Sequence, residues 1–162
     1  MSESASLRGI KQIGALIERA NSLEARMAYL IDLYIGASGI GRDFLRSRVL
    51  HNSIVSYAGK VKLTLAITKT VGGPKINRDK LHRLGMIRNA FAHGQLAESL
   101  RRVRDDGGAT IKEYVVVETL RGDGSVTEIN RADAIAEFVK LYDELMAQFE
   151  DLERKINVAN DV

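Results

Sequence analysis

A stripe of apolar side chains near the C-terminus is the feature that most constrains how this 162-residue chain can fold. Its members recur at alternating steps of three and four residues: Ile135, Phe138, Tyr142, Leu145, Phe149, Leu152 and Ile156. This spacing places them on one side of an α-helix, which we expect over about 131–157. A free coiled coil and the core-facing side of a bundle helix would both show the pattern, and we favour the bundle helix.

Four further helices are indicated nearer the N-terminus. One has a cap signal, because Asn21 stands three residues before Glu24 and apolar residues at helical spacing follow. The others are expected at about 6–19, 42–70 and 77–93. Asn52 or Ser53 is suited to cap a second helix within the longest of these, and Gly94 is suited to end the last.

One region has a different pattern. The segment "TIKEYVVVETL" is rich in β-branched residues, "RGDG" is a turn sequence, and "SVTEI" resumes the strand pattern. We therefore expect a β-hairpin at about 110–129. The sequence predicts a mainly α fold, an up-down helical bundle with one inserted β-hairpin, in a single domain spanning residues 1–162.

The net charge of +3 is divided unevenly along the chain. Residues 1–104 carry 18 Lys and Arg against 7 Asp and Glu, a net charge of +11, whereas residues 105–162 carry 6 against 14, a net charge of −8. A basic block of this kind is typical of proteins that bind a polyanion. The alternative, that the two parts pack together and neutralise each other, stays open.

Several classes of protein are excluded by composition. Cysteine is absent, which excludes disulfides, thiolate catalysis and cysteine metal sites. The N-terminus has no basic leader followed by an apolar core. The most apolar window, "MAYLIDLYIG", is too short to cross a bilayer and contains Asp32. We therefore expect a cytoplasmic protein with no membrane partner.

The helix expected at 77–93 has two distinct sides. At about 100° per residue, one side is an apolar stripe: Leu81, Leu84, Ile87 and Phe91. The opposite side carries a second stripe: His82, Met86, Asn89 and His93. A solvated surface is usually richer in Lys and Glu, so we expect this second side, with Gly85, to be a homodimer interface or the wall of a cleft. Glycine is costly in a helix, and close approach of another backbone would explain Gly85, although it can equally be neutral.

The segment "RNAFAH", Arg88 to His93, resembles the Arg-x(4–6)-His motif of the HEPN superfamily, in which a polar residue such as Asn89 often follows the arginine. The resemblance implies a small dimeric helical bundle with the motif at the dimer interface. It also implies a metal-independent endoribonuclease of a toxin or defence system, with an antitoxin or regulatory protein as a partner. Arg88 and His93 would then be catalytic, and Asn89 would assist.

The chemistry of these three side chains fits RNA hydrolysis. A neutral His93 imidazole can take the proton of a 2′-hydroxyl, and the Arg88 guanidinium can stabilise the charge of the transition state. Asn89 can orient the phosphate or His93. Further cations could contact RNA phosphates, although each can equally be ordinary solvated charge: Lys60, Lys62, Arg83, Arg101 and Arg102. No cofactor or metal is expected, because His82, Asn89 and His93 offer too few ligands.

The position of Arg88 raises a geometrical difficulty. In a straight helix Arg88 and His93 lie about 140° apart around the axis. The arginine stem must therefore curl around the helix, the helix must unwind before Gly94, or a second subunit must supply one partner.

Two other functions fit the same residues. A catalytically silent HEPN-like module would bind a nucleotide, RNA or a protein partner. A structural dimerisation bundle would use the stripe of the last helix as its interface. The residues alone do not decide between an active and a silent domain.

Overall fold

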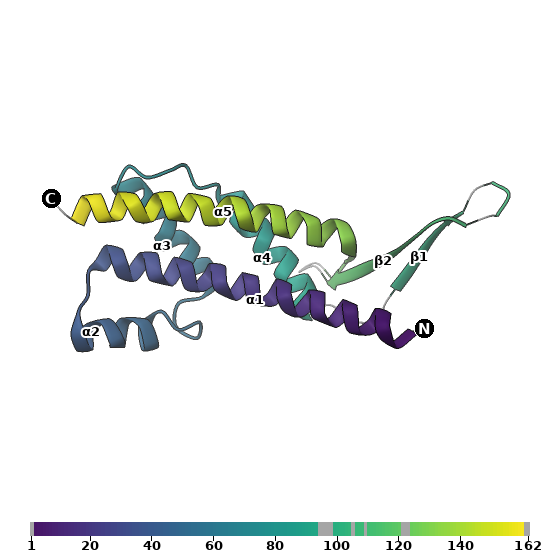
Figure 1. Cartoon of the computed structure of the whole chain (residues 1–162), viewed down its shortest axis with the longest axis horizontal. Coiled ribbons are helices and arrows are strands. Elements are labelled where there is room, and N and C mark those ends of the chain that lie inside the picture. The colour runs from purple at the N-terminus through teal and green to yellow at the C-terminus, as the bar shows by residue number, and fades with distance from the viewer. Residues whose placement is uncertain (1, 94–98, 105, 109, 121–123, 161–162) are drawn as a thin grey trace. The chain divides into compact units, whose positions relative to one another are not determined.

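The structure, a computed structural model, describes residues 2–93, 99–104, 106–108, 110–120 and 124–160. Within these ranges the protein is mainly helical and has a small antiparallel sheet (Figure 1). The elements in chain order are α1 (Ser2–Ile35), α2 (Gly39–Phe44), the π-helix η1 (Leu45–Val49), α3 (Tyr57–Thr70), α4 (Arg78–His93), β1 (Ser99–Arg104), β2 (Thr110–Leu120), β3 (Val126–Asn130) and α5 (Arg131–Asn160). No helix of the described part is long and apolar enough to cross a membrane.

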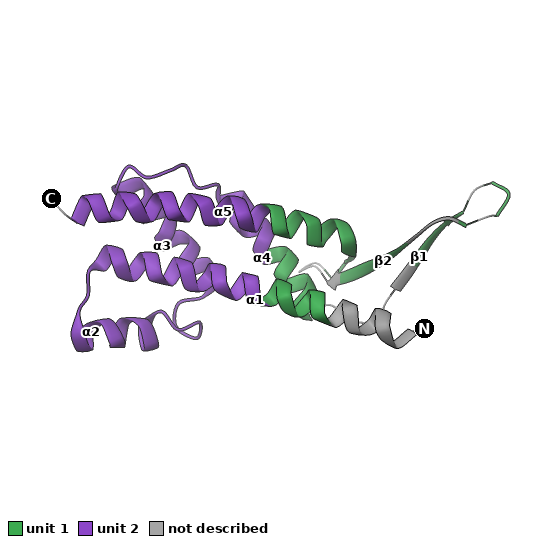
Figure 2. Cartoon of the chain, in the orientation of Figure 1, with its two compact units in different colours: residues 1–17, 86–140 green, residues 18–85, 141–162 purple. Residues whose placement is uncertain are grey.

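The chain divides into two compact units (Figure 2). Unit 1 consists of Met1–Ile17 and Met86–Lys140, and unit 2 consists of Glu18–Gly85 and Leu141–Val162. The buried apolar residues of unit 1 come from helices and from β2: Leu16, Ile87, Ala90, Phe91, Val116, Ala134 and Phe138. The core of unit 2 is larger and contains, among the described residues, eight completely buried leucine, methionine and phenylalanine side chains of three helices: Leu23, Met27, Leu30, Leu81, Leu84, Leu145, Phe149 and Leu152.

The apolar stripe of α5 is buried, as a bundle helix requires, but with a different period from a heptad. Its buried residues are Ala134, Phe138, Leu141, Leu145, Phe149, Leu152 and Ile156. Ile135 and Tyr142, which the heptad spacing places in the stripe, are only half-buried, and the residue before each is buried instead. The buried positions repeat every 11 residues, which is three helical turns. This is close to the roughly 3.6 residues per turn of a straight helix. A left-handed coiled coil would keep the shorter period of seven.

The expected boundary at Asn21 is wrong, because α1 runs without interruption from Ser2 to Ile35. Asn21 is exposed, and Ser22 donates to the backbone oxygen of Glu18 at 3.0 Å, a bond made inside a helix. Buried residues continue at helical spacing on both sides of this point: Leu16, Ala20, Leu23, Met27 and Leu30. Burial of this stripe therefore outweighs the local cap signal. The helix ends where Gly36 adopts a φ of 67°.

The expected helix at 42–70 is also divided differently. It consists of α2, η1 and α3, and α3 is capped by Ser56, whose Oγ accepts a hydrogen bond from the Gly59 amide at 3.3 Å. Neither Asn52 nor Ser53 is the cap. The Asn52 side-chain oxygen instead accepts a hydrogen bond from Lys60 Nζ. The Asn52 side chain, which is of a type that often caps helices, therefore provides a hydrogen-bond acceptor for a buried lysine.

The described sheet has three strands in the order β1-β2-β3. The hairpin expected at 110–129 is confirmed, because β2 and β3 pair antiparallel, with Val116 opposite Asn130 and Leu120 opposite Val126. Strand β1 was not predicted; it pairs antiparallel with the first half of β2, from Ser99 opposite Val116 to Arg104 opposite Thr110. Three arginines in "SLRRVR" hide its strand character.

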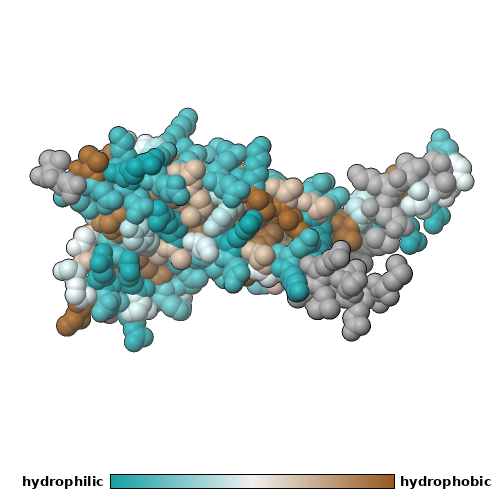
Figure 3. Space-filling model, viewed as in Figure 1, coloured by the Kyte–Doolittle hydropathy of each residue, from teal (hydrophilic) through white to brown (hydrophobic). Residues whose placement is uncertain are grey.

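A small apolar surface lies on α2. The side chains of Ile40 and Phe44 are 90% and 61% exposed. Figure 3 shows hydrophobic colour in the region that α2 occupies in Figure 1. Isolated apolar side chains are common on protein surfaces, so we assign no role to this one.

Candidate functional site

Helix α4 has the two sides that its sequence predicts. Leu81, Leu84 and Ile87 are completely buried and Phe91 is 5% exposed, so the apolar stripe faces the core. This orientation follows from the helical period, because apolar residues three and four apart share one side. The opposite side of α4 is therefore left toward solvent.

The exposed side of α4 carries Met86, Asn89 and His93. Met86 is 60% exposed, and Asn89 and His93 are also exposed. Asn89 and His93 are four residues apart, so they are neighbours on the helix surface, and His93 is the last residue of α4. The imidazole and the amide can therefore reach the same ligand.

Arg88 approaches this side although its Cα does not belong to it. Its side chain is half-buried, and its Nη1 donates a hydrogen bond of 3.0 Å to the side-chain oxygen of Asn89. The stem therefore curls around the helix toward Asn89, which lies on the side that also carries His93. A guanidinium has five N–H donors, so the bond to Asn89 leaves others for an oxyanion.

Two acidic residues that could have held Arg88 as a structural arginine have other partners. Glu24 accepts a bond of 2.9 Å from Lys60 Nζ. Asp32 is paired with Arg42 at 3.2 Å and with Arg46 at 2.9 Å. Among the described residues, Arg88 has no carboxylate partner within salt-bridge distance.

Gly85 is explained within the chain rather than by a second backbone. A Cβ atom at this position would lie 3.0 Å from Cε1 of Tyr57. The Tyr57 ring is held there, because its hydroxyl donates a hydrogen bond of 2.8 Å to the backbone oxygen of Leu81. Burial raises the pKa of Tyr57 far above its usual value. The expectation that another backbone approaches Gly85 is therefore wrong, and Gly85 provides no evidence for a dimer interface.

His82 is also engaged within its own helix. Arg78 Nε lies 3.1 Å from His82 Nε2, and the two residues are one turn apart on α4. The bond makes Nε2 the acceptor in this arrangement. No group of three or more His, Asp or Glu side chains placed to hold a metal ion occurs among the described residues.

The cations expected to contact RNA are in unequal environments. Lys60 is 3% exposed and bonded to Glu24 and Asn52, so its assignment as an RNA contact is wrong. Lys62 is exposed. Arg101 donates through Nε to both carboxylate oxygens of Glu128 at 3.0 Å, which raises the pKa of Arg101 and keeps it charged, but this charge is already balanced by the carboxylate. The two remaining arginines, Arg83 and Arg102, also interact within the chain.

The sequence analysis missed a cavity at the start of α5. Side chains of α1, β2, β3 and α5 line it, among them Gln12, Tyr114, Asn130 and Arg131. Asn130 stands three residues before Asp133, a spacing typical of a helix N-terminus, and this was the available signal. It indicated the start of a helix but not a cavity, because the other walls come from distant segments.

Comparison of the chain with models of protein families, with curated proteins and with solved structures found no match. The function therefore has to be inferred from the chemistry of the sites.

Proposed function

We propose that this protein is a metal-independent endoribonuclease in which Arg88, Asn89 and His93 act together on an RNA phosphate. One observation carries the proposal. The Arg88 guanidinium is hydrogen-bonded to Asn89, and Asn89 shares the exposed side of α4 with His93. An imidazole, an amide and a guanidinium are thereby available to one ligand.

The proposed reaction is attack of a 2′-hydroxyl on the adjacent phosphate. Neutral His93 takes the hydroxyl proton, the 2′-oxygen bonds to phosphorus, and the 5′-oxygen leaves and takes a proton from water. The products are a 2′,3′-cyclic phosphate and a 5′-hydroxyl end. Arg88 binds the non-bridging oxygens, whose charge grows in the transition state, and Asn89 positions the guanidinium.

The resemblance of the "RNAFAH" segment to the HEPN motif supports the same proposal. On that basis we also propose a homodimer, with the exposed side of α4 at the interface, and a role in a toxin or defence system under the control of an antitoxin or regulatory protein. An RNA-binding module without activity is the alternative that the test must separate.

The test is cleavage of a mixed single-stranded RNA pool by the purified protein in EDTA. We expect His93→Ala and Arg88→Ala each to lower the rate by about a hundred- to a thousandfold, as loss of a charge-stabilising group typically does. Asn89→Ala should have a smaller effect. His51→Ala is the matched control, because His51 is an exposed histidine bonded to Ser53 and not to the motif.

Circular dichroism should show the same helical signal in all variants, because the changed side chains lie outside the apolar core. Unchanged cleavage in His93→Ala would contradict the proposal. Tight RNA binding by the wild type without any cleavage would make the binding module the function.

A further inference from the structure

The cavity at the start of α5 has the size and lining of a small-molecule site. Its volume is about 690 Å³, within the range typical of ligand pockets. One part of its wall is apolar: Val115, Ala132, Ile135 and Ala136. The remaining part carries a few polar side chains: Gln12, Tyr114, Asn130, Arg131 and Asp133. All of these residues belong to unit 1.

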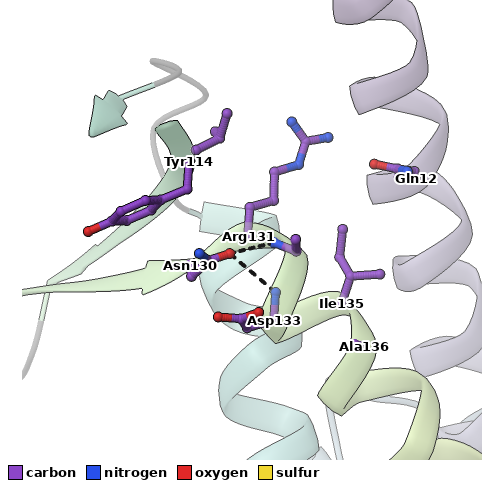
Figure 4. A pocket seen from close by; sticks show the side chains of 9 residues that line it. Gln12, Tyr114, Asn130, Arg131, Asp133, Ile135 and Ala136 are labelled. Atoms are coloured by element: carbon purple, nitrogen blue, oxygen red, sulfur yellow. Dashed lines mark hydrogen bonds between the residues drawn. The ribbon is translucent and has the colours of Figure 1, made fainter. Parts of the chain in front are cut away.

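Arg131 is a residue of the cavity lining whose buried donors lack a partner among the described residues. Its Nε and Nη2 atoms are shielded from solvent and have no hydrogen-bond partner among the described residues. Figure 4 shows the guanidinium directed between Tyr114 of β2 and Gln12 of α1. Buried polar groups are normally hydrogen-bonded, because leaving them unpaired loses their hydration. Two buried, unpaired donors in a side chain that lines the cavity therefore indicate a missing acceptor for this guanidinium.

The neighbouring polar groups do not supply that acceptor. The Asn130 side-chain oxygen caps α5 by accepting from the amides of Ala132 at 3.0 Å and Asp133 at 3.2 Å. Figure 4 shows the Asp133 carboxylate on the other side of Asn130 from the Arg131 guanidinium. The helix start is thus already capped, and Arg131 with Gln12 provides the donors that a ligand could use.

We propose that this cavity binds a small organic oxyanion, a phosphate monoester or a carboxylate on a flat apolar body, with the oxyanion on Arg131. A guanidinium presents parallel N–H groups that match two oxygens of a phosphate or carboxylate. The Gln12 amide can donate to a third oxygen or to the body. Ile135 and the Tyr114 ring provide contact for the apolar part, which gives this site selectivity over the free inorganic ion.

The experiment titrates the full-length protein with phenyl phosphate and with benzoate, which separate the two sources of the oxyanion. Two control probes each lack one part of the ligand: inorganic phosphate lacks the aromatic ring, and phenol lacks the oxyanion. Binding is followed by calorimetry and by the ¹H–¹⁵N signal of Arg131 Nε. We expect at least one of the two aromatic anions to bind and to shift that signal. Inorganic phosphate and phenol should each bind more weakly.

Three variants and one control test the assignment. Arg131→Gln should weaken binding of the aromatic anion by about ten- to a hundredfold, because it removes charged hydrogen bonds. Arg131→Lys should be intermediate, because it keeps the charge without the planar fork. Ala136→Phe should fill the cavity and abolish binding of the aromatic anion. Arg104→Gln removes an exposed arginine of β1 and should change nothing.

Three results would overturn the proposal. The first is no saturation by phenyl phosphate or benzoate at about 10 mM, since binding would then be weaker than millimolar. The second is an equal loss of affinity in Arg104→Gln and Arg131→Gln, which would indicate unspecific charge. The third is full binding in Ala136→Phe, which would place the ligand outside the cavity.

Discussion

Glu153 on α5 is held in its charged form by two residues of α1. Tyr29 donates a hydrogen bond of 2.6 Å to one carboxylate oxygen, and the Arg26 guanidinium binds the other. The Tyr29 bond, with Arg26, lowers the pKa of Glu153 below its ordinary value of 4.5, and the same bond raises the pKa of Tyr29. The carboxylate form is therefore more stable in the folded chain than in the unfolded chain.

This pKa shift predicts how the stability of the fold changes as the pH falls. As pH falls, the unfolded chain takes up this proton first, so the contribution of Glu153 is complete above the unfolded pKa near 4.5 and is lost as pH falls through the folded pKa. We expect Glu153→Gln to lower the melting temperature more at pH 7 than at pH 3. Thermal melts over this range are the measurement. Glu150→Gln, at an exposed position of the same helix, is the control, and an identical pH profile for both variants would contradict the prediction.

At the residue scale, sequence predicts which side of a helix a residue occupies better than what its side chain reaches. The buried stripe of α4 follows from spacing alone. The bond between Arg88 and Asn89 depends on the rotamer of a long side chain, which the spacing does not determine. The Gly85 contact could not be predicted either, because Tyr57 lies 28 positions earlier in the chain.

At the element scale, β2 is the strand that connects the sheet to the core. Val116 is 4% exposed and pairs with both Ser99 and Asn130. Glu118 and Glu128 stand opposite each other in the register of β2 and β3, and Arg101 from β1 is paired with both. An arginine placed in this way relieves the repulsion of two facing carboxylates.

The connection between β1 and β2 should matter less for the stability of the fold than the buried part of β2. We expect replacement of residues 104–110 by Asn-Gly, a favoured two-residue turn, to leave the melting temperature nearly unchanged. The described side chains there are exposed. Val116→Ala should instead destabilise the fold by about 1–3 kcal/mol, because it removes buried methyl groups. Urea denaturation measures both, and equal effects of the two changes would show that the centre of β2 is not part of the core.

The elements that sequence predicts well are those whose pattern is both long and regular. The stripe of α5 extends over many turns, and the β-branched residues of β2 together with the turn sequence after it are enough to predict the hairpin. Strand β1 was not predicted, because its arginines are more typical of a solvated segment than of a strand. The false boundary at Asn21 has the opposite cause, since a local capping signal is weak against the burial of a continuous stripe.

At the scale of the whole molecule, the basic and acidic parts of the chain pair with each other. Arg26 with Glu153, Lys80 with Glu144, and Arg101 with Glu128 each join a cation of the first 104 residues to a carboxylate of the remainder. The internal neutralisation that the sequence left open therefore accounts for part of the charge asymmetry. The two more exposed pairs, Lys80 with Glu144 and Arg101 with Glu128, each contribute little to stability, so their main effect is on the surface potential.

The proposed homodimer is tested by changing one exposed residue. We expect the wild type to be a dimer at micromolar concentration in light scattering. Met86→Glu should produce a monomer, because it puts a charge into the proposed interface without disturbing the core. Ile40→Glu is the control, since Ile40 is 90% exposed on α2. A wild-type monomer, or a dimer broken by Ile40→Glu alone, would exclude the proposed interface.

The division into two units limits how this protein can be cut or recombined. The chain passes from one unit to the other at 17/18, 85/86 and 140/141, and each of these points lies inside a helix. Each unit is built from two segments that are separated in the chain, so no continuous fragment consists of one unit alone, and neither unit can be expressed by itself by truncating the gene. A protease that cut at these points would have to unwind α1, α4 or α5 first, because helical backbone does not fit a protease cleft. Gene fusion or exchange would therefore have to transfer the whole chain.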